Sequence, residues 1–147
     1  MMAIGVLPLE LAWCVDLASG SHLIGLTDYM FDGAKPLFLR GLSLFHVPLP
    51  PTILWLLYRF GYDSRSLPRQ LALIWLVLPL TYFLTDPTDN INWVYGPGSQ
   101  PQHVLPPLAY LAVEMAALPL FVLLPMHLLM RRLFGADGLF RLRLPQA

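Results

Sequence analysis

The longest apolar run in this chain extends from Val104 to Met130 and contains a single charged residue, Glu114. A helix of about 20 apolar residues spans the hydrocarbon core of a bilayer, which is roughly 30 Å thick. This run is therefore long enough to cross a membrane even if its helix is tilted. It predicts a transmembrane helix over residues 104–130.

Three other apolar runs are of the same kind, at residues 2–18, 41–60 and 67–85. The composition also indicates a membrane protein, because 56% of the residues are hydrophobic and 12% are charged, whereas about 25% of the residues in a soluble domain are charged. We therefore predict an all-α polytopic membrane protein in which one domain, residues 1–147, holds four transmembrane helices. The first run contains Glu10 and Asp16, which make exposure to lipid costly, so a buried or re-entrant path stays open for it.

Proline is frequent, with 15 residues in the chain, and several prolines lie inside the apolar runs. Proline removes a backbone N–H from a helix. Transmembrane helices tolerate this loss because neighbouring groups satisfy the freed carbonyls. We therefore expect kinked helices, with the candidate positions at Pro48, Pro50, Pro51, Pro79, Pro119 and Pro125.

The positive charges gather at one end of the predicted bundle. Residues 59–69 hold three arginines and the chain after Met130 holds four, whereas 85–103 hold no lysine or arginine and 19–40 hold two. Cytoplasmic segments are the ones enriched in Lys and Arg, so the 59–69 turn and both termini are predicted to be cytoplasmic, with the connections 19–40 and 85–103 outside. The 9 basic and 9 acidic residues balance, so no net field attracts a nucleic acid.

The outer connection 85–103 is rich in turn-forming sequences such as Asp-Pro and Gly-Pro-Gly. We expect it to form an ordered cap in which Trp93 and Tyr95 dip toward the bilayer. These two rings are candidates for contact with a ligand or a pigment. Candidates for contact with a partner subunit are Asn90, Asn92, Trp93, Arg59 and Arg65.

Ionisable residues inside apolar helices are the strongest functional signal in a membrane protein. Glu10, Asp16, His46 and Glu114 fall in the outer half of the predicted bundle. One interpretation is a shared polar cavity that opens outward and binds a metal, a proton, a quinone or a lipid head group, with the two glutamates and the histidine as candidate catalytic residues. The simpler interpretation is a set of separate interhelical hydrogen bonds.

The histidines do not have the H-x-x-x-H or H-E-x-x-H spacing of a metal site, and a single cysteine, Cys14, excludes an internal disulfide. No metal site is therefore predicted. One intramembrane histidine is enough to ligate haem or a chlorophyll-type pigment, which leaves His46 and His127 as candidate ligands. The alternatives are a hydrogen bond from His46 to a carbonyl freed by the nearby prolines and a helix-end position for His127. The cofactors under consideration are bound lipid, quinone, haem and pigment.

Two stretches, SLFHVPLPPTILWLLYRFGYDSRSL and LTDPTDNINWVYGPG, resemble a family of uncharacterised multi-pass bacterial membrane proteins. Members of that family carry similar FH-x-x-LP, GYD-x-R and NINWV-x-GPG stretches. The similarity covers roughly residues 22–134. It implies a polytopic protein of the bacterial inner membrane and assigns no catalytic residue.

We expect the function to be non-enzymatic: an accessory subunit that packs against a larger membrane complex, with a respiratory or photosynthetic complex as one candidate host. The expected partners are lipid and other membrane protein subunits, and no nucleic acid. One alternative is a membrane-embedded enzyme that acts on a lipid-linked substrate at the outer leaflet. Another is a small element that conducts protons or solutes.

Overall fold

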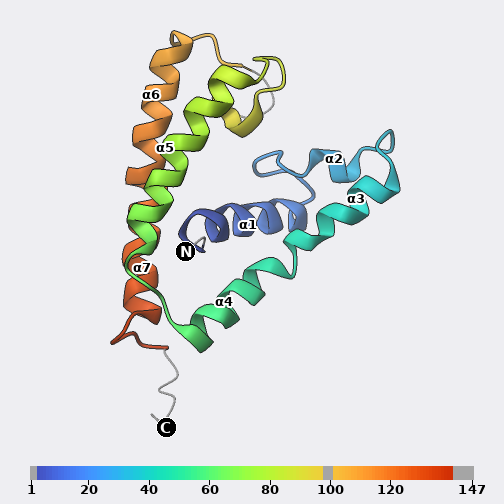
Figure 1. Ribbon diagram of the computed structural model, residues 1–147. Helices are drawn as coiled ribbons and strands as arrows, with labels where there is room; N and C mark the ends of the chain where they lie inside the picture. Colours follow the sequence, from blue (N-terminus) through green and yellow to red (C-terminus); the bar gives the residue numbers. More distant parts are fainter. Residues whose placement is uncertain (1–2, 98–100, 141–147) are drawn as a thin grey trace.

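The computed structural model describes residues 3–97 and 101–140, and over these residues the chain is helical with no strand (Figure 1). Arg141 and Arg143, which contribute to the predicted charge asymmetry, and the last glycine of the Gly-Pro-Gly turn lie outside the described residues. The helices are α1 (Ala3–Ala18), α2 (Asp28–Phe31), α3 (Leu37–Ser43), the 3₁₀ turn η1 (Leu44–His46), α4 (Leu49–Phe60), α5 (Ser66–Leu84), the 3₁₀ turn η2 (Ile91–Trp93), α6 (Pro107–Ala117), the π-helical turn η3 (Leu118–Leu123) and α7 (Leu124–Phe134).

Three of the described helices are long and apolar enough to cross a membrane: Leu37–Phe60, Ser66–Leu84 and Pro107–Phe134. The prediction of an all-helical chain compatible with a membrane is therefore confirmed. The predicted count of four is not, because α1 has 16 residues and is roughly 24 Å long at 1.5 Å per residue. That length is less than the hydrocarbon core of a typical bilayer.

The apolar side chains of the long helices lie mainly on the outside of the molecule. Phe38 and Phe121 are each 78% exposed, and Phe60 and Phe83 are 75% and 71% exposed. Water-soluble monomers rarely expose large continuous apolar surfaces. The distribution is compatible with a lipid environment, in which these rings meet acyl chains instead of water.

Prolines mark the places where the long helices change geometry. The segment predicted as one helix over 41–60 is divided by η1 and Pro48, and α4 begins only at Leu49. The last long helix passes through η3, whose second residue is Pro119. A proline within a helix leaves the carbonyl four residues before it without its usual donor, which accounts for the 3₁₀ and π turns at these points.

Helix α1 runs across the molecule between two groups of longer helices (Figure 1). On one side, α5 lies beside α6, and on the other the chain rises through α4, η1 and α3. The first two turns of α1 supply the centre of the larger hydrophobic cluster, in which Ile4 and Leu7 are 0% and 1% exposed. The other buried members of this cluster are Leu57, Tyr62, Leu123, Met130 and Phe134.

The turn between α4 and α5 is joined to the end of α7. Gly61 ends α4 with a φ of 78°, in the left-handed region that favours glycine. The next residue, Tyr62, donates its backbone N–H to the carbonyl of Phe134 at 2.7 Å. The arginine-rich turn and the end of the last long helix therefore lie at the same end of the bundle.

Tyr62 also links this turn to α7 through its side chain. Its hydroxyl is 2.8 Å from Nδ1 of His127, and both residues are buried, at 8% exposure each. Burial raises the pKa of the Tyr62 phenol, opposed by a hydrogen bond from Ser66, so the hydroxyl is neutral at physiological pH. His127 is therefore a buried residue that holds the α4–α5 turn against α7, and not only a residue at a helix end.

We predict that Tyr62→Phe lowers the stability of the protein by about 1–2 kcal/mol, because His127 loses a buried partner. The measurement is thermal unfolding of the purified protein in detergent. Tyr58→Phe is the matched control, since Tyr58 lies two residues before the end of α4 and is 40% exposed. Equal transition temperatures for the two variants would contradict a stabilising role of the Tyr62 hydroxyl.

Candidate functional site

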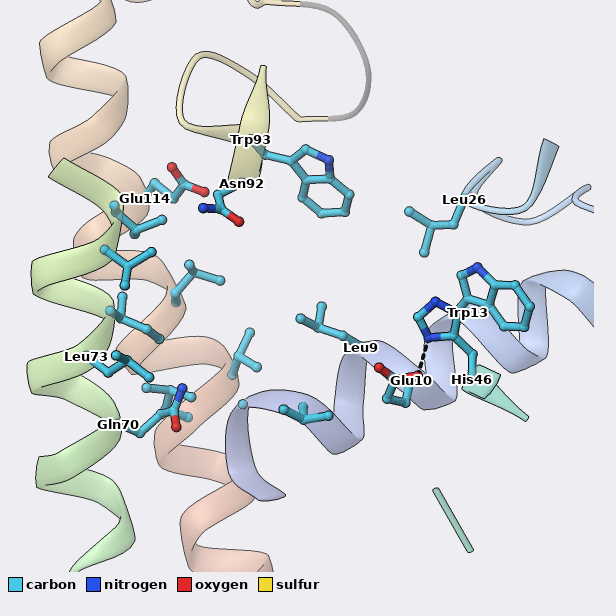
Figure 2. Close-up of a pocket in the computed structure, with 18 residues that line it drawn as sticks. Leu9, Glu10, Trp13, Leu26, His46, Gln70, Leu73, Asn92, Trp93 and Glu114 are labelled. Atoms are coloured by element: carbon cyan, nitrogen blue, oxygen red, sulfur yellow. Dashed lines mark hydrogen bonds and ion pairs between the residues drawn. The ribbon is translucent and has the colours of Figure 1, made fainter. Parts of the chain in front are cut away.

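A cavity of about 630 Å³ lies between α1, α5, α6 and η3 (Figure 2). Most of its wall is aliphatic, from residues such as Leu73, Ile74 and Val77 of α5. Ligand pockets in proteins are commonly a few hundred to about 1,000 Å³ and have few polar groups. The polar and aromatic side chains in this wall are Glu10, Trp13, His46, Gln70, Asn92, Trp93 and Glu114.

The cavity therefore brings together residues that are far apart in the sequence. Of the four residues predicted to share a cavity, Glu10, His46 and Glu114 line it, whereas Asp16 does not. Asn92 and Trp93 of the 85–103 connection line it too. This is the geometry of the shared-cavity interpretation, although the role of these residues stays a prediction.

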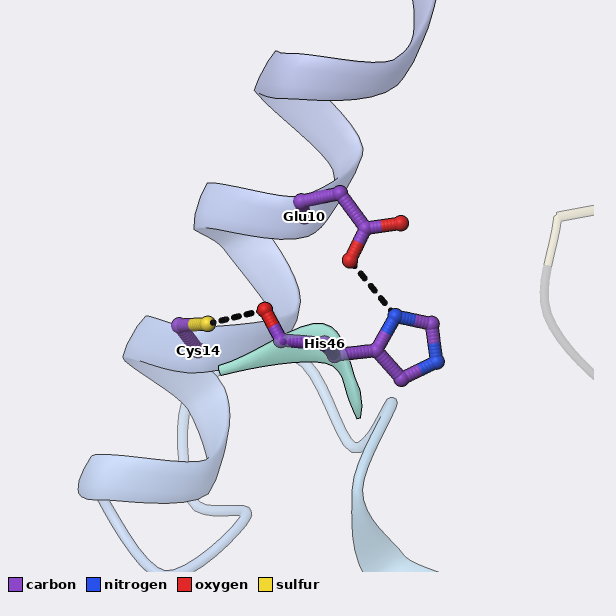
Figure 3. A network of polar contacts seen from close by, with 3 residues as sticks. All are labelled: Glu10, Cys14 and His46. Carbon is purple, nitrogen blue, oxygen red and sulfur yellow. Dashed lines mark hydrogen bonds and ion pairs between the residues drawn. The ribbon is translucent and has the colours of Figure 1, made fainter. Parts of the chain in front are cut away.

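Glu10 and His46 form the closest polar contact in the site (Figure 3). Oε2 of Glu10 lies 2.5 Å from Nδ1 of His46, and the two side chains are 12% and 23% exposed. The imidazole also packs against two aromatic rings, with centroids 4.5 Å from Trp13 and 4.0 Å from Phe45. The imidazole thus bonds a carboxylate rather than one of the carbonyls freed by the prolines.

The backbone of His46 makes a second contact with α1. Its carbonyl would normally accept the N–H of the residue four positions later, but that residue is Pro50, which has none. The carbonyl instead accepts the thiol of Cys14 at 3.4 Å. Glu10 and Cys14 are one turn apart on α1, so one face of this helix docks on the break between α3 and α4.

The arrangement leaves the other ring nitrogen of His46 available to the cavity. Nε2 is turned toward the space bounded by Leu26 and Trp93 (Figure 2). A carboxylate at Nδ1 favours the tautomer with its proton on Nδ1, which makes Nε2 a hydrogen-bond acceptor. The same geometry suits proton transfer to or from a bound molecule.

Gln70 and Glu114 line other parts of the wall and contain buried oxygens without a hydrogen-bond partner. These atoms are Oε1 of Gln70, a residue that is 6% exposed, and Oε2 of Glu114. Glycine at position 5 leaves room for the Gln70 side chain, because a Cβ there would lie 2.8 Å from its amide nitrogen and would make that side chain shift. Sequence reasoning did not identify Gln70, and its position in an apolar run was the available signal.

The chain around η2 forms one side of the cavity and is organised by its asparagines. Asn90 is buried, accepts the N–H of Tyr95 at 3.0 Å and donates to the carbonyl of Gly96 at 2.8 Å. The amide of Asn92 donates to the hydroxyl of Thr81 at 2.9 Å. These bonds attach the connection to the end of α5, with Trp93 beside the cavity.

Tyr95 has a different position from Trp93. It is 8% exposed, stacks on Tyr82 with ring centroids 4.7 Å apart and donates to the Tyr82 carbonyl at 2.5 Å. It belongs to the second hydrophobic cluster, with Leu78, Val94 and Leu111, and does not line the cavity. Of the two rings predicted to meet a ligand, only Trp93 has access to this space.

Asp16 lies outside the cavity wall and organises the loop that follows α1. Its side chain is fully buried and accepts the backbone N–H groups of Ile24 at 2.8 Å, Gly25 at 3.2 Å and Thr27 at 2.9 Å. The hydroxyls of Thr27 and Ser21 donate to the same carboxylate, at 2.9 and 3.2 Å. Asp16 thus differs from Glu10, the other acidic residue of α1, because the loop that follows the helix supplies its donors, whereas Glu10 bonds His46 in the cavity wall.

The remaining predicted residues lie at the other end of the molecule or bond within the protein. Arg59 and Arg65 are exposed at the α4–α5 turn, where Asp63 accepts the N–H of Arg65 at 2.9 Å and lies 3.6 Å from Arg69. His127 bonds Tyr62 as described above. Within residues 3–97 and 101–140, no three His, Cys, Asp or Glu side chains come together as metal ligands would.

No family model, curated protein or solved structure matches this chain. The resemblance of its sequence stretches to multi-pass bacterial membrane proteins stays an expectation.

We predict that Asp16→Asn lowers the unfolding temperature clearly, because an amide in place of the carboxylate turns an N–H group toward the donors of the loop. Asp28→Asn, at an exposed carboxylate in the neighbouring helix α2, is the control and should leave it nearly unchanged. Thermal unfolding in detergent measures both. A loss of the same size in the two variants would mean that the 21–27 loop does not depend on Asp16.

Proposed function

We propose that this protein is a multi-pass membrane subunit whose cavity binds an amphipathic, lipid-like molecule without transforming it. The observation that supports the proposal is the composition of the cavity wall: a largely aliphatic space of about 630 Å³ with a few polar side chains. Such a wall suits an acyl or isoprenoid chain, and the polar side chains suit its head group. Lipid, quinone and pigment tails share this chemistry.

The proposed orientation places the α4–α5 turn on the cytoplasmic side of a bacterial inner membrane, because its arginines follow the positive-inside rule. The end of α7 then lies on the same side of the membrane, since the carbonyl of Phe134 accepts the backbone N–H of Tyr62 in that turn. The start of α1 packs in the same cluster through Ile4 and Leu7, so both termini are proposed to be cytoplasmic. Helix α1 is then the fourth helix of the membrane domain, oblique and shorter than the other three.

The proposed accessory role is supported by the small size of the protein and by its exposed apolar side chains. Three long helices and α1 border the cavity and leave many large side chains on the outside, including Trp55 and Trp75 at 56% and 53% exposure. Tryptophan is common where membrane proteins meet one another or the interface. The exposed arginines of the α4–α5 turn are proposed as the contact with a larger complex.

The orientation is tested by cysteine labelling in a Cys14→Ser background, with single cysteines introduced by Ser64→Cys or His103→Cys, both at exposed positions. A membrane-impermeant maleimide added to intact spheroplasts should label the His103→Cys variant only, and inverted vesicles should reverse the result. Labelling of the Ser64→Cys variant from the periplasmic side would overturn the proposed orientation.

The cavity is tested by filling it. We predict that Leu9→Trp displaces the bound molecule, because Leu9 lines the cavity and is 55% exposed, so a larger ring enters the space without displacing the core. Leu11→Trp is the matched control, since Leu11 is on the same helix, is 41% exposed and does not line the cavity.

Native mass spectrometry of protein extracted in a mild detergent gives the result. The wild type and the Leu11→Trp variant should retain an additional mass of a few hundred daltons that the Leu9→Trp variant lacks. Retention of the same mass by all three proteins, or its absence from all three, would contradict a ligand in this cavity.

A further inference from the structure

The acidic and hydrogen-bonding groups of the cavity allow a more specific statement about its ligand. Its wall contains two carboxyl side chains, Glu10 and Glu114, and no lysine or arginine. Glu10 already has a partner in His46. Glu114 has no basic side chain within ion-pair distance in the described part of the chain.

The two buried polar atoms of the wall that have no partner are both hydrogen-bond acceptors. Oε1 of Gln70 is an amide oxygen in a residue that is 6% exposed, and Oε2 of Glu114 is a carboxyl oxygen. Buried acceptors without donors are uncommon, because each costs free energy relative to water. The carboxyl of Glu114 is a terminal group whose torsion is soft, so a donor in the cavity reaches Oε2 when the carboxyl turns. Gln70 lies at the other end of the cavity, beyond Leu73 (Figure 2).

The aromatic side chains of the wall favour the same kind of head group. Trp93 lies on the same side of the cavity as Glu114 and Asn92, across from His46 (Figure 2). The face of an indole ring attracts a cation, and a cation–π contact is stronger where water is excluded. A phosphate or carboxylate head group would meet Glu114 without a lysine or arginine to neutralise it.

We infer that the cavity selects an amphiphile with a positively charged, hydrogen-bond-donating head group, such as a primary ammonium, bound by Glu114 and Trp93, with its tail along α5 toward Gln70. The inference rests on the proposed function, because it names the ligand class of the same cavity. An ammonium supplies a positive charge beside the Glu114 carboxyl and a donor for the unpartnered oxygen of that carboxyl. The aliphatic wall from Leu73 to Val77 receives the tail.

The experiment uses the full chain in phosphatidylcholine nanodiscs, whose surface has no net charge, and four radiolabelled probes with the same twelve-carbon tail. The probes are dodecylammonium, dodecyltrimethylammonium, dodecanol and dodecanoate. Binding to empty nanodiscs is subtracted. Dodecylammonium should bind about tenfold more tightly than dodecanol, which corresponds to roughly 1.4 kcal/mol, and dodecanoate should bind most weakly.

The quaternary probe separates charge from hydrogen bonding. Dodecyltrimethylammonium has the positive charge but no N–H donor, so it should bind more weakly than dodecylammonium and more tightly than dodecanol. Equal binding of the two cations would overturn the part of the inference in which the head group donates a hydrogen bond to Glu114. Equal binding of dodecanol and dodecylammonium would overturn the part that assigns a charge.

Glu114→Gln provides the test at the residue level. The change removes the charge and keeps the size, and it should weaken dodecylammonium binding about tenfold while leaving dodecanol binding unchanged, which also shows that the variant is folded. Asp89→Asn is the control, because Asp89 is an exposed carboxylate outside the cavity wall. This variant should bind dodecylammonium and dodecanol with the affinities of the wild type. An unaltered affinity of the Glu114→Gln variant for dodecylammonium would overturn the inference.

The outcomes distinguish this inference from the proposed function. If all four probes bind alike and Leu9→Trp blocks them, the cavity is a ligand site but has no preference for cations. If no probe binds above the level of empty nanodiscs, the ligand site itself is refuted.

Discussion

The docking of α1 on the break between α3 and α4 determines the rest of this structure. The break exists because Pro50 cannot donate to the His46 carbonyl, and α1 supplies a thiol to that carbonyl and a carboxylate to the imidazole of the same residue. Two bonds from consecutive turns fix both the position and the rotation of α1. A proline-rich segment that would weaken an isolated helix thus becomes the attachment point for another.

Local sequence was sufficient for the parts of the fold that depend on run length and backbone chemistry. The two later long helices lie within a few residues of their predicted bounds, because an apolar run of that length with a single charged residue has few alternatives to a helix. The end of α4 at Gly61 likewise follows from glycine's access to positive φ. The division at η1 was less predictable, since transmembrane helices often continue through proline.

The candidate site depended on tertiary information that the sequence does not contain. Glu10 and His46 are 36 positions apart, and nothing in the spacing of either residue specifies the other as its partner. The two acids of α1 also look equivalent in the sequence, yet Asp16 is surrounded by the donors of its own loop and Glu10 faces the cavity. That difference arises because the 21–27 loop folds back over the last turn of α1, which is a property of the loop and not of the helix.

The cavity follows from the shortness and direction of α1. A longer helix parallel to α5 and α6 would fill the space between them with its own side chains. Because α1 runs across the bundle, its first turns pack on α4 and α7, whereas beyond Gly5 it diverges from α5 and leaves the space that Trp93 and Leu26 border. Glycine at position 5 permits the contact with Gln70 where the two helices are closest. The polar groups in this wall are therefore consequences of helix geometry as well as candidates for function, and the preference of the cavity for charge decides between these roles.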